Sequence, residues 1–175
     1  EARGRPVCCA SGEAVCQDVR VRWSLAIPVV FLSLLWAGCG SDEAVTPTVC
    51  LESPAKLETA LVTAPDQVLI DGTVPISGCM VRDQMNGDIV KFGSHAVRVA
   101  TKLGTTAAGS GPEAIPAAIQ VGYLVGAMDK ASEESDGIHA SLVGRVQSAA
   151  TYRMSDSPAA QVHYDAGFEA GSKLG

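Results

Sequence analysis

The sequence predicts an all-α fold, a small antiparallel bundle of about four helices within residues 53–175. Three patterns predict it. Apolar residues recur at helical steps over residues 85–103, and residues 114–128 are almost entirely apolar, as in a helix that is buried on all sides. Two Ser-Pro pairs, at Ser53 and Ser157, combine a capping residue with proline at the first helical position.

The first helix is expected directly after Ser53, with Pro54 in its first turn. It would be short, because Pro65 ends it. One of its faces would carry Leu57, Leu61 and Val62.

Residues 65–78 carry one strand-like run, Val68-Leu69-Ile70, followed by a turn signal at Asp71-Gly72. Two interpretations are open, a short strand or an extended segment laid on the core. Because no second strand-like run is available for pairing, the sequence favours the extended segment.

The helix over residues 85–103 has the clearest pattern, since its apolar positions follow steps of four and three while charged residues fall elsewhere on the helical wheel. These apolar positions are Met85, Ile89, Phe92, Ala96, Val99 and Leu103. Residues 104–111, rich in Gly, Thr, Ser and Ala, are expected to form the next loop.

The next helix should begin at Pro112 or Pro116 and run towards Ser135 as the central member of the bundle. Small residues recur in it at every fourth position and would let a neighbouring backbone approach closely. These residues are Ala118, Gly122 and Gly126. Its apolar run of roughly 15 residues is shorter than the roughly 20 of a membrane span, so a packed helix is favoured.

Two further helices complete the predicted bundle. Asp136-Gly137 breaks the pattern, and an amphipathic helix ending near Arg153 follows, marked by Ile138, Leu142, Val146 and Ala149. Ser157-Pro158 opens the last helix, whose inner face would carry Ala160, Tyr164, Gly167, Phe168 and Gly171. Short connections between the helices favour antiparallel neighbours.

Residues 19–38 have the composition of an export signal. Two arginines are followed by an uncharged apolar run that ends at Leu35-Trp36-Ala37-Gly38-Cys39, where small side chains suit a signal peptidase. These last residues resemble the lipobox of bacterial lipoproteins, which implies a signal helix in the precursor, cleavage before Cys39 and lipidation of Cys39 as the new N-terminus. The alternative is an uncleaved membrane helix, but the apolar run is short and Pro28 interrupts it.

This organisation divides the chain into four parts. Residues 1–18 show no apolar period, and we expect them to be a disordered upstream extension of the reading frame, with translation starting near Val19 or Val21. The signal at 19–38 follows, then a flexible tether at 39–52 and a single helical domain at 53–175.

An exported chain of this kind would have two cysteines left after lipidation, Cys50 and Cys79. Exported proteins usually pair such cysteines, so we expect a disulfide that staples the extended N-terminal segment, which would lie against the bundle.

The exported part is acidic. Residues 39–175 contain 9 Lys and Arg against 16 Asp and Glu, a formal net charge of −7. The basic residues are scattered along the sequence, so nucleic acid is not an expected partner. The same balance disfavours adsorption to anionic lipid, so membrane attachment would depend on acyl groups.

No catalytic motif is present, and we predict no catalytic residue and no cofactor. His95, His139 and His163 fall on three different predicted helices, which can gather ligands in a bundle. They lack the HxxxH and Glu-x-x-His spacings that make a metal site on a helix, so they are weak metal candidates.

Three classes of function are consistent with these features. The leading one is a non-enzymatic, lipid-anchored binding or scaffold module on the extracytoplasmic side of the cell envelope, with an envelope protein as partner. The alternative is a small-ligand or metal carrier that uses the bundle interior, which would need a sizeable apolar cavity. An envelope enzyme would require one of the histidines to meet a carboxylate in a cleft.

Overall fold

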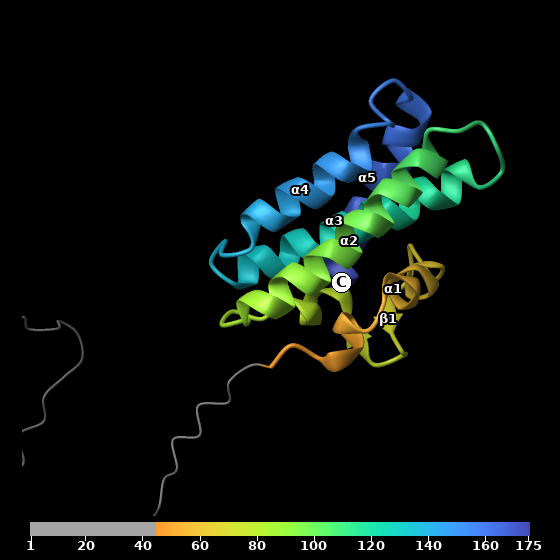
Figure 1. The fold of residues 1–175 in the computed structure, drawn as a ribbon. Helices are drawn as coiled ribbons and strands as arrows, with labels where there is room; N and C mark the ends of the chain where they lie inside the picture. Colours follow the sequence, from red (N-terminus) through yellow and green to blue (C-terminus); the bar gives the residue numbers. More distant parts are fainter. Residues whose placement is uncertain (1–44) are drawn as a thin grey trace, which may run out of the picture. The chain divides into compact units, whose positions relative to one another are not determined.

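The computed structural model describes residues 45–175, so the predicted extension, signal peptide and lipidation site at Cys39 lie outside the described residues. The described part is a helical bundle with one small ribbon (Figure 1). Its helices are α1 (Pro54–Leu61), α2 (Asn86–Ala107), α3 (Ala114–Glu134), α4 (Ala140–Thr151) and α5 (Pro158–Leu174). The strands are β1 (Leu69–Ile70) and β2 (Val74–Pro75), and two 3₁₀ turns span Thr48–Leu51 and Ile76–Cys79. The predicted all-α bundle is confirmed.

The two Ser-Pro pairs start helices as their chemistry dictates. The side chain of Ser53 accepts a hydrogen bond from the N–H of Lys56 at 3.4 Å, and Ser157 accepts one from Ala160 at the same distance. In both helices proline occupies the first turn. Backbone N–H groups there have no partner within the helix, so the missing N–H of proline costs no hydrogen bond. Local sequence thus fixes where α1 and α5 begin.

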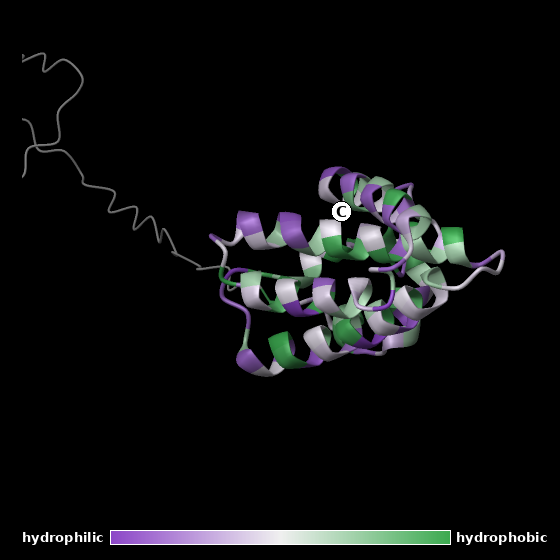
Figure 2. Cartoon of the chain, turned by 90° about the horizontal axis from the view of Figure 1, so that it is seen from above, coloured by the Kyte–Doolittle hydropathy of each residue, from purple (hydrophilic) through white to green (hydrophobic). Residues whose placement is uncertain are grey.

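Helix α3 is the centre of the bundle. It contacts α5 along one side and α2 and α4 along another, and α1 packs against α2 and α3. Figure 2 shows green, apolar positions alternating with purple, hydrophilic ones on the helices, as amphipathic elements require. On α3 the run of residues 121–128 is buried without interruption, which agrees with its nearly continuous apolar sequence.

Glycines bring α3 and α5 into direct backbone contact. A Cβ atom added at Gly122 would overlap the carbonyl oxygen of Tyr164 and lie 2.9 Å from the backbone nitrogen of Phe168. One added at Gly126 would overlap the carbonyl oxygen of Phe168. From the other side, glycines of α5 meet backbone carbonyl oxygens of α3 in the same way, Gly167 at Ile119 and Gly171 at Tyr123. Only glycine permits so close an approach of two helices.

Two helix pairs of the bundle run parallel, although successive helices are antiparallel as the short connections indicated. The chain does reverse direction between successive helices (Figure 1), but α3 pairs with α5, and α2 lies beside α4. The pairing residues ascend together in both pairs, as Ile119 with Gly167, Tyr123 with Gly171, Gly93 with Leu142, and Gly104 with Ala150. The predicted antiparallel relation therefore holds between successive helices, and the parallel pairs arise because glycines let those helices approach closely.

Several predicted boundaries differ from the observed ones. Helix α2 continues to Ala107, so the expected loop over 104–111 is shorter, and Gly104 packs inside the helix pair against the carbonyl group of Ala150. Met85 and Ile138, assigned to apolar faces, are 74% and 56% exposed. Both residues precede their helices, where the chain turns into solvent. The predicted apolar faces therefore begin too early in the sequence.

The segment after α1 is a two-stranded ribbon, which corrects the predicted extended segment. Strand β1 pairs antiparallel with β2, with Ile70 opposite Val74. Asp71 and Gly72 make the turn with positive φ angles of 50° and 71°. The second strand was missed because it is two residues long and contains Pro75, which a strand tolerates at an edge.

Tyr123 fastens this ribbon to the central helix. Its side chain is fully buried in α3, and its hydroxyl oxygen accepts a hydrogen bond from the N–H of Val68 at 3.1 Å. Burial raises the pKa of the Tyr123 hydroxyl, although the bond from Val68 acts in the opposite direction. A polar residue in the apolar helix therefore satisfies a buried backbone donor.

Candidate functional site

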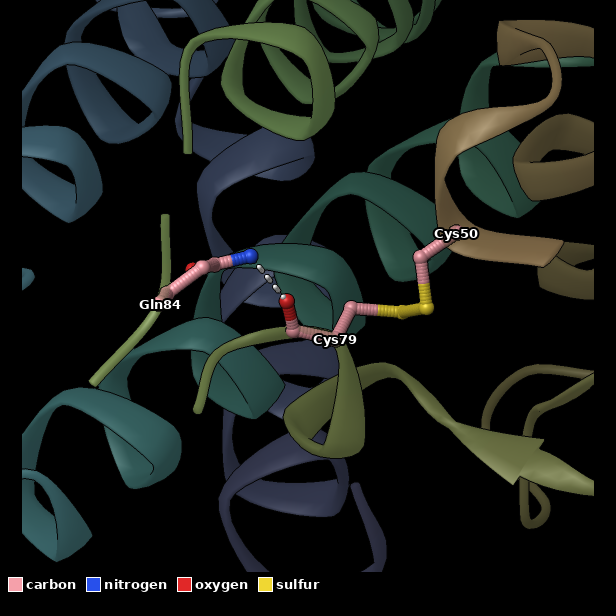
Figure 3. Close-up of a disulfide and its surroundings, with 3 residues drawn as sticks. All are labelled: Cys50, Cys79 and Gln84. Carbon is pink, nitrogen blue, oxygen red and sulfur yellow. Dashed lines mark hydrogen bonds between the residues drawn. A yellow bond between two sulfur atoms is a disulfide. The ribbon is translucent and has the colours of Figure 1, made fainter. Parts of the chain in front are cut away.

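The disulfide expected from the sequence is present between Cys50 and Cys79 (Figure 3). Both residues are buried, with their Cα atoms 5.7 Å apart. The side chain of Gln84 donates a hydrogen bond from Nε2 to the carbonyl oxygen of Cys79 at 2.9 Å. Cys50 lies in the 3₁₀ turn Thr48–Leu51, so the last residues of the predicted tether belong to the folded body.

The three histidines lie apart in the fold. His95 is half-buried on α2, His163 is half-buried on α5, and His139 is 2% exposed at the start of α4. Within residues 45–175, no group of three or more His, Cys, Asp and Glu side chains is arranged to hold a metal ion. The bundle therefore does not gather the histidines into one site.

His139 is held by a short hydrogen-bond chain. Its Nδ1 lies 2.9 Å from the hydroxyl oxygen of Ser135, and that hydroxyl donates to the carbonyl oxygen of Ala131 at 2.9 Å. The direction of the hydrogen bond between Ser135 and His139 depends on which ring nitrogen of the imidazole carries the proton. Nε2 is buried without a partner among the described residues. Burial lowers the pKa of the His139 imidazole.

The lowered pKa of His139 predicts acid-sensitive stability. The unfolded chain takes up this proton near pH 6.5, whereas the folded chain takes it up only at lower pH. Neutral His139 should therefore contribute fully to the free energy of unfolding above about pH 6.5. That free energy should fall as the pH drops from there towards the folded-state pKa. Urea unfolding of wild type and His139→Gln at pH 7.5 and 5.5 checks this, because the variant should lose less stability between the two values. Equal losses would contradict the prediction.

Depressions open on the surface of the described residues, and three of them contain charged or titratable side chains. One, of about 220 Å³, lies where α3 and α5 begin and is lined by Ser110 and His163. A second, of about 380 Å³, lies between α1 and the ribbon turn. The third, of about 360 Å³, lies between α2 and α4 and is lined by Arg98 and Arg145. All three are open to solvent, so none provides the enclosed interior that a carrier would use.

The α2–α4 depression contains residues that the sequence analysis missed. Arg98 and Arg145 are 47 residues apart in the chain and appeared there as scattered charges. A signal was available in the charge of the two helices, because α4 contains no acidic residue and α2 contains only Asp88. Sequence alone did not place these helices side by side.

Among residues 45–175, no helix combines the length and the apolar character needed to cross a bilayer. Comparison of the chain with known proteins gives no matching family model, no matching curated protein and no matching solved structure. The activity of the chain must therefore be inferred from its own residues and their geometry.

Proposed function

We propose that this chain is a lipid-anchored protein on the extracytoplasmic side of the bacterial cell envelope, where its helical body acts as a non-enzymatic binding or scaffold module. The observation that carries the proposal is a disulfide-stapled body that begins a few residues after a lipobox-like Cys39. Disulfides persist in oxidising compartments, so the Cys50–Cys79 bond supports export. The lipobox-like residues support attachment through acyl chains.

The short connection between Cys39 and the body supports a role close to the membrane. Thr46 is already buried in the folded body, with an exposed fraction of 3%, and it lies seven residues after Cys39. A fully extended chain of that length spans at most roughly 25 Å. Acyl chains on Cys39 would thus hold the bundle within a protein diameter of the bilayer.

The packing of the body supports a rigid platform rather than a moving enzyme. Backbones of α3 and α5 touch at several glycines, and the disulfide fixes the segment nearest the tether. Close packing of this kind transmits force and resists deformation. Such a body is suited to present a fixed surface to a partner.

Expression of the full chain in a bacterium, with Cys39→Ala as the test variant and Ser41→Ala as the control, tests the anchor. Wild type and the Ser41 variant should appear in the membrane fraction, cleaved before residue 39 and carrying the mass of acyl groups, and globomycin should block this processing. Cys39→Ala should carry no acyl mass. An unacylated wild-type product in the cytosol, or processing that globomycin leaves unchanged, would refute the proposal.

A further inference from the structure

The charges of the described residues are unevenly distributed. Helices α2 and α4 together carry four Lys and Arg residues and one acidic residue, although residues 45–175 as a whole contain 9 basic and 14 acidic side chains. Of the four, Lys102 pairs with Glu58 on α1. The remaining cations are Lys91, Arg98 and Arg145, all exposed and without an ion-pair partner among residues 45–175.

The two arginines line one groove, here called the α2–α4 groove. Its residues are Val90, Gly93, Ser94, Val97, Arg98 and Arg145. Helix α2 supplies the apolar part, because Val90 is 69% exposed and Val97, two turns further along the helix, is half-buried. Gly93 lets the side chain of Leu142 approach from α4, which holds the two helices side by side (Figure 1).

The geometry points to the α2–α4 groove as the docking site for an acidic, amphipathic segment of a partner protein, with an apolar side chain against Val90 and Val97 and carboxylates at Arg98 and Arg145. This inference rests on the proposed binding function and names its surface and partner class. Two guanidinium groups beside an apolar recess complement that chemistry, since arginine binds carboxylates through paired hydrogen bonds.

A protein segment fits this groove better than a lipid surface does. The recess lies between two helices and holds about 360 Å³, which a projecting side chain fills and a flat bilayer surface does not. The described residues also carry a net negative charge, which opposes adsorption of the whole body to anionic lipid. The test therefore includes binding of the groove to anionic lipid as the alternative result.

Binding of two labelled peptides to the full-length, membrane-reconstituted chain tests the inference. Both peptides are amphipathic helices of equal length with leucine on one face, and one carries glutamate and the other lysine on the flanking positions. Fluorescence anisotropy should show binding of the glutamate peptide only, with an affinity that falls as salt is raised. The double variant Arg98→Glu/Arg145→Glu should weaken this binding at least about tenfold.

A matched control reverses two charges outside the groove. Arg153→Glu/Lys173→Glu changes the net charge by the same amount. It should leave the affinity within about twofold, because salt screens the interaction of the peptide with exposed charges far from the groove. If the reversed groove variant unfolds, Arg98→Gln/Arg145→Gln removes the charges without introducing repulsion and should still weaken binding severalfold.

The outcomes separate this inference from the proposed function. Binding of both peptides alike, of neither, or equal weakening in the control pair would overturn the groove assignment. Binding to vesicles containing 30% phosphatidylglycerol that the groove variant alone abolishes would overturn it in favour of a lipid surface. If Cys39 is not acylated but the chain still binds the glutamate peptide selectively, the proposed anchor is refuted and the groove assignment stands.

Discussion

Gly122→Ala should destabilise the protein by about 2 to 4 kcal/mol, although alanine is the better helix former. The added Cβ would overlap the carbonyl oxygen of Tyr164, which belongs to the backbone and cannot rotate away. Helices α3 and α5 would have to separate along their length, and the neighbouring contacts at Gly126 and Gly171 would loosen together. Urea unfolding followed by far-UV circular dichroism measures the loss.

Gly144→Ala is the matched control. Gly144 also lies inside a helix, but it is exposed on α4, and outside the adjoining turns of its own helix no atom lies within 4 Å of the Cβ position. The same substitution there should increase the free energy of unfolding by about 0.5 to 1 kcal/mol, because only the helix propensity changes. Equal effects of the two substitutions would show that the backbone contact between α3 and α5 does not govern stability.

The predictable parts of this fold are those that depend on residues close in the chain. Ser53 and Ser157 cap helices within three residues of themselves, so the starts of α1 and α5 followed from local chemistry. The buried character of α3 followed from its continuous apolar run. The pairing of Cys50 with Cys79 followed from the small number of available partners.

The missed features depend on contacts between distant residues. The sequence showed small residues on α3 and glycines on α5, but it did not show that Gly122 meets Tyr164 in a parallel pair. Tyr123 receives its hydrogen bond from Val68, 55 residues away, and this bond has no local signature. The α2–α4 groove likewise exists only because packing brings two helices of like charge together.

Loss of the Cys50–Cys79 disulfide should lower the free energy of unfolding by about 3 to 4 kcal/mol. The bond joins residues 29 positions apart, and on the chain-entropy model cross-linking a loop of this size restricts the unfolded state by about that amount. This loss is a large fraction of the roughly 5 to 15 kcal/mol that holds a typical domain folded. The segment from Thr46 to the ribbon should loosen first, because the bond joins the turn at its start to the turn that follows the ribbon.

Urea unfolding of the wild type with and without dithiothreitol, beside Cys50→Ala/Cys79→Ala, measures this effect. The reductant should destabilise the wild type and leave the double variant unchanged, which separates the disulfide from other actions of the reductant. The dependence of unfolding free energy on urea should also steepen, because an unfolded chain without the cross-link exposes more surface. A wild type that is equally stable in both conditions would mean that packing and the hydrogen bonds of Tyr123 and Gln84 hold the N-terminal segment without the cross-link.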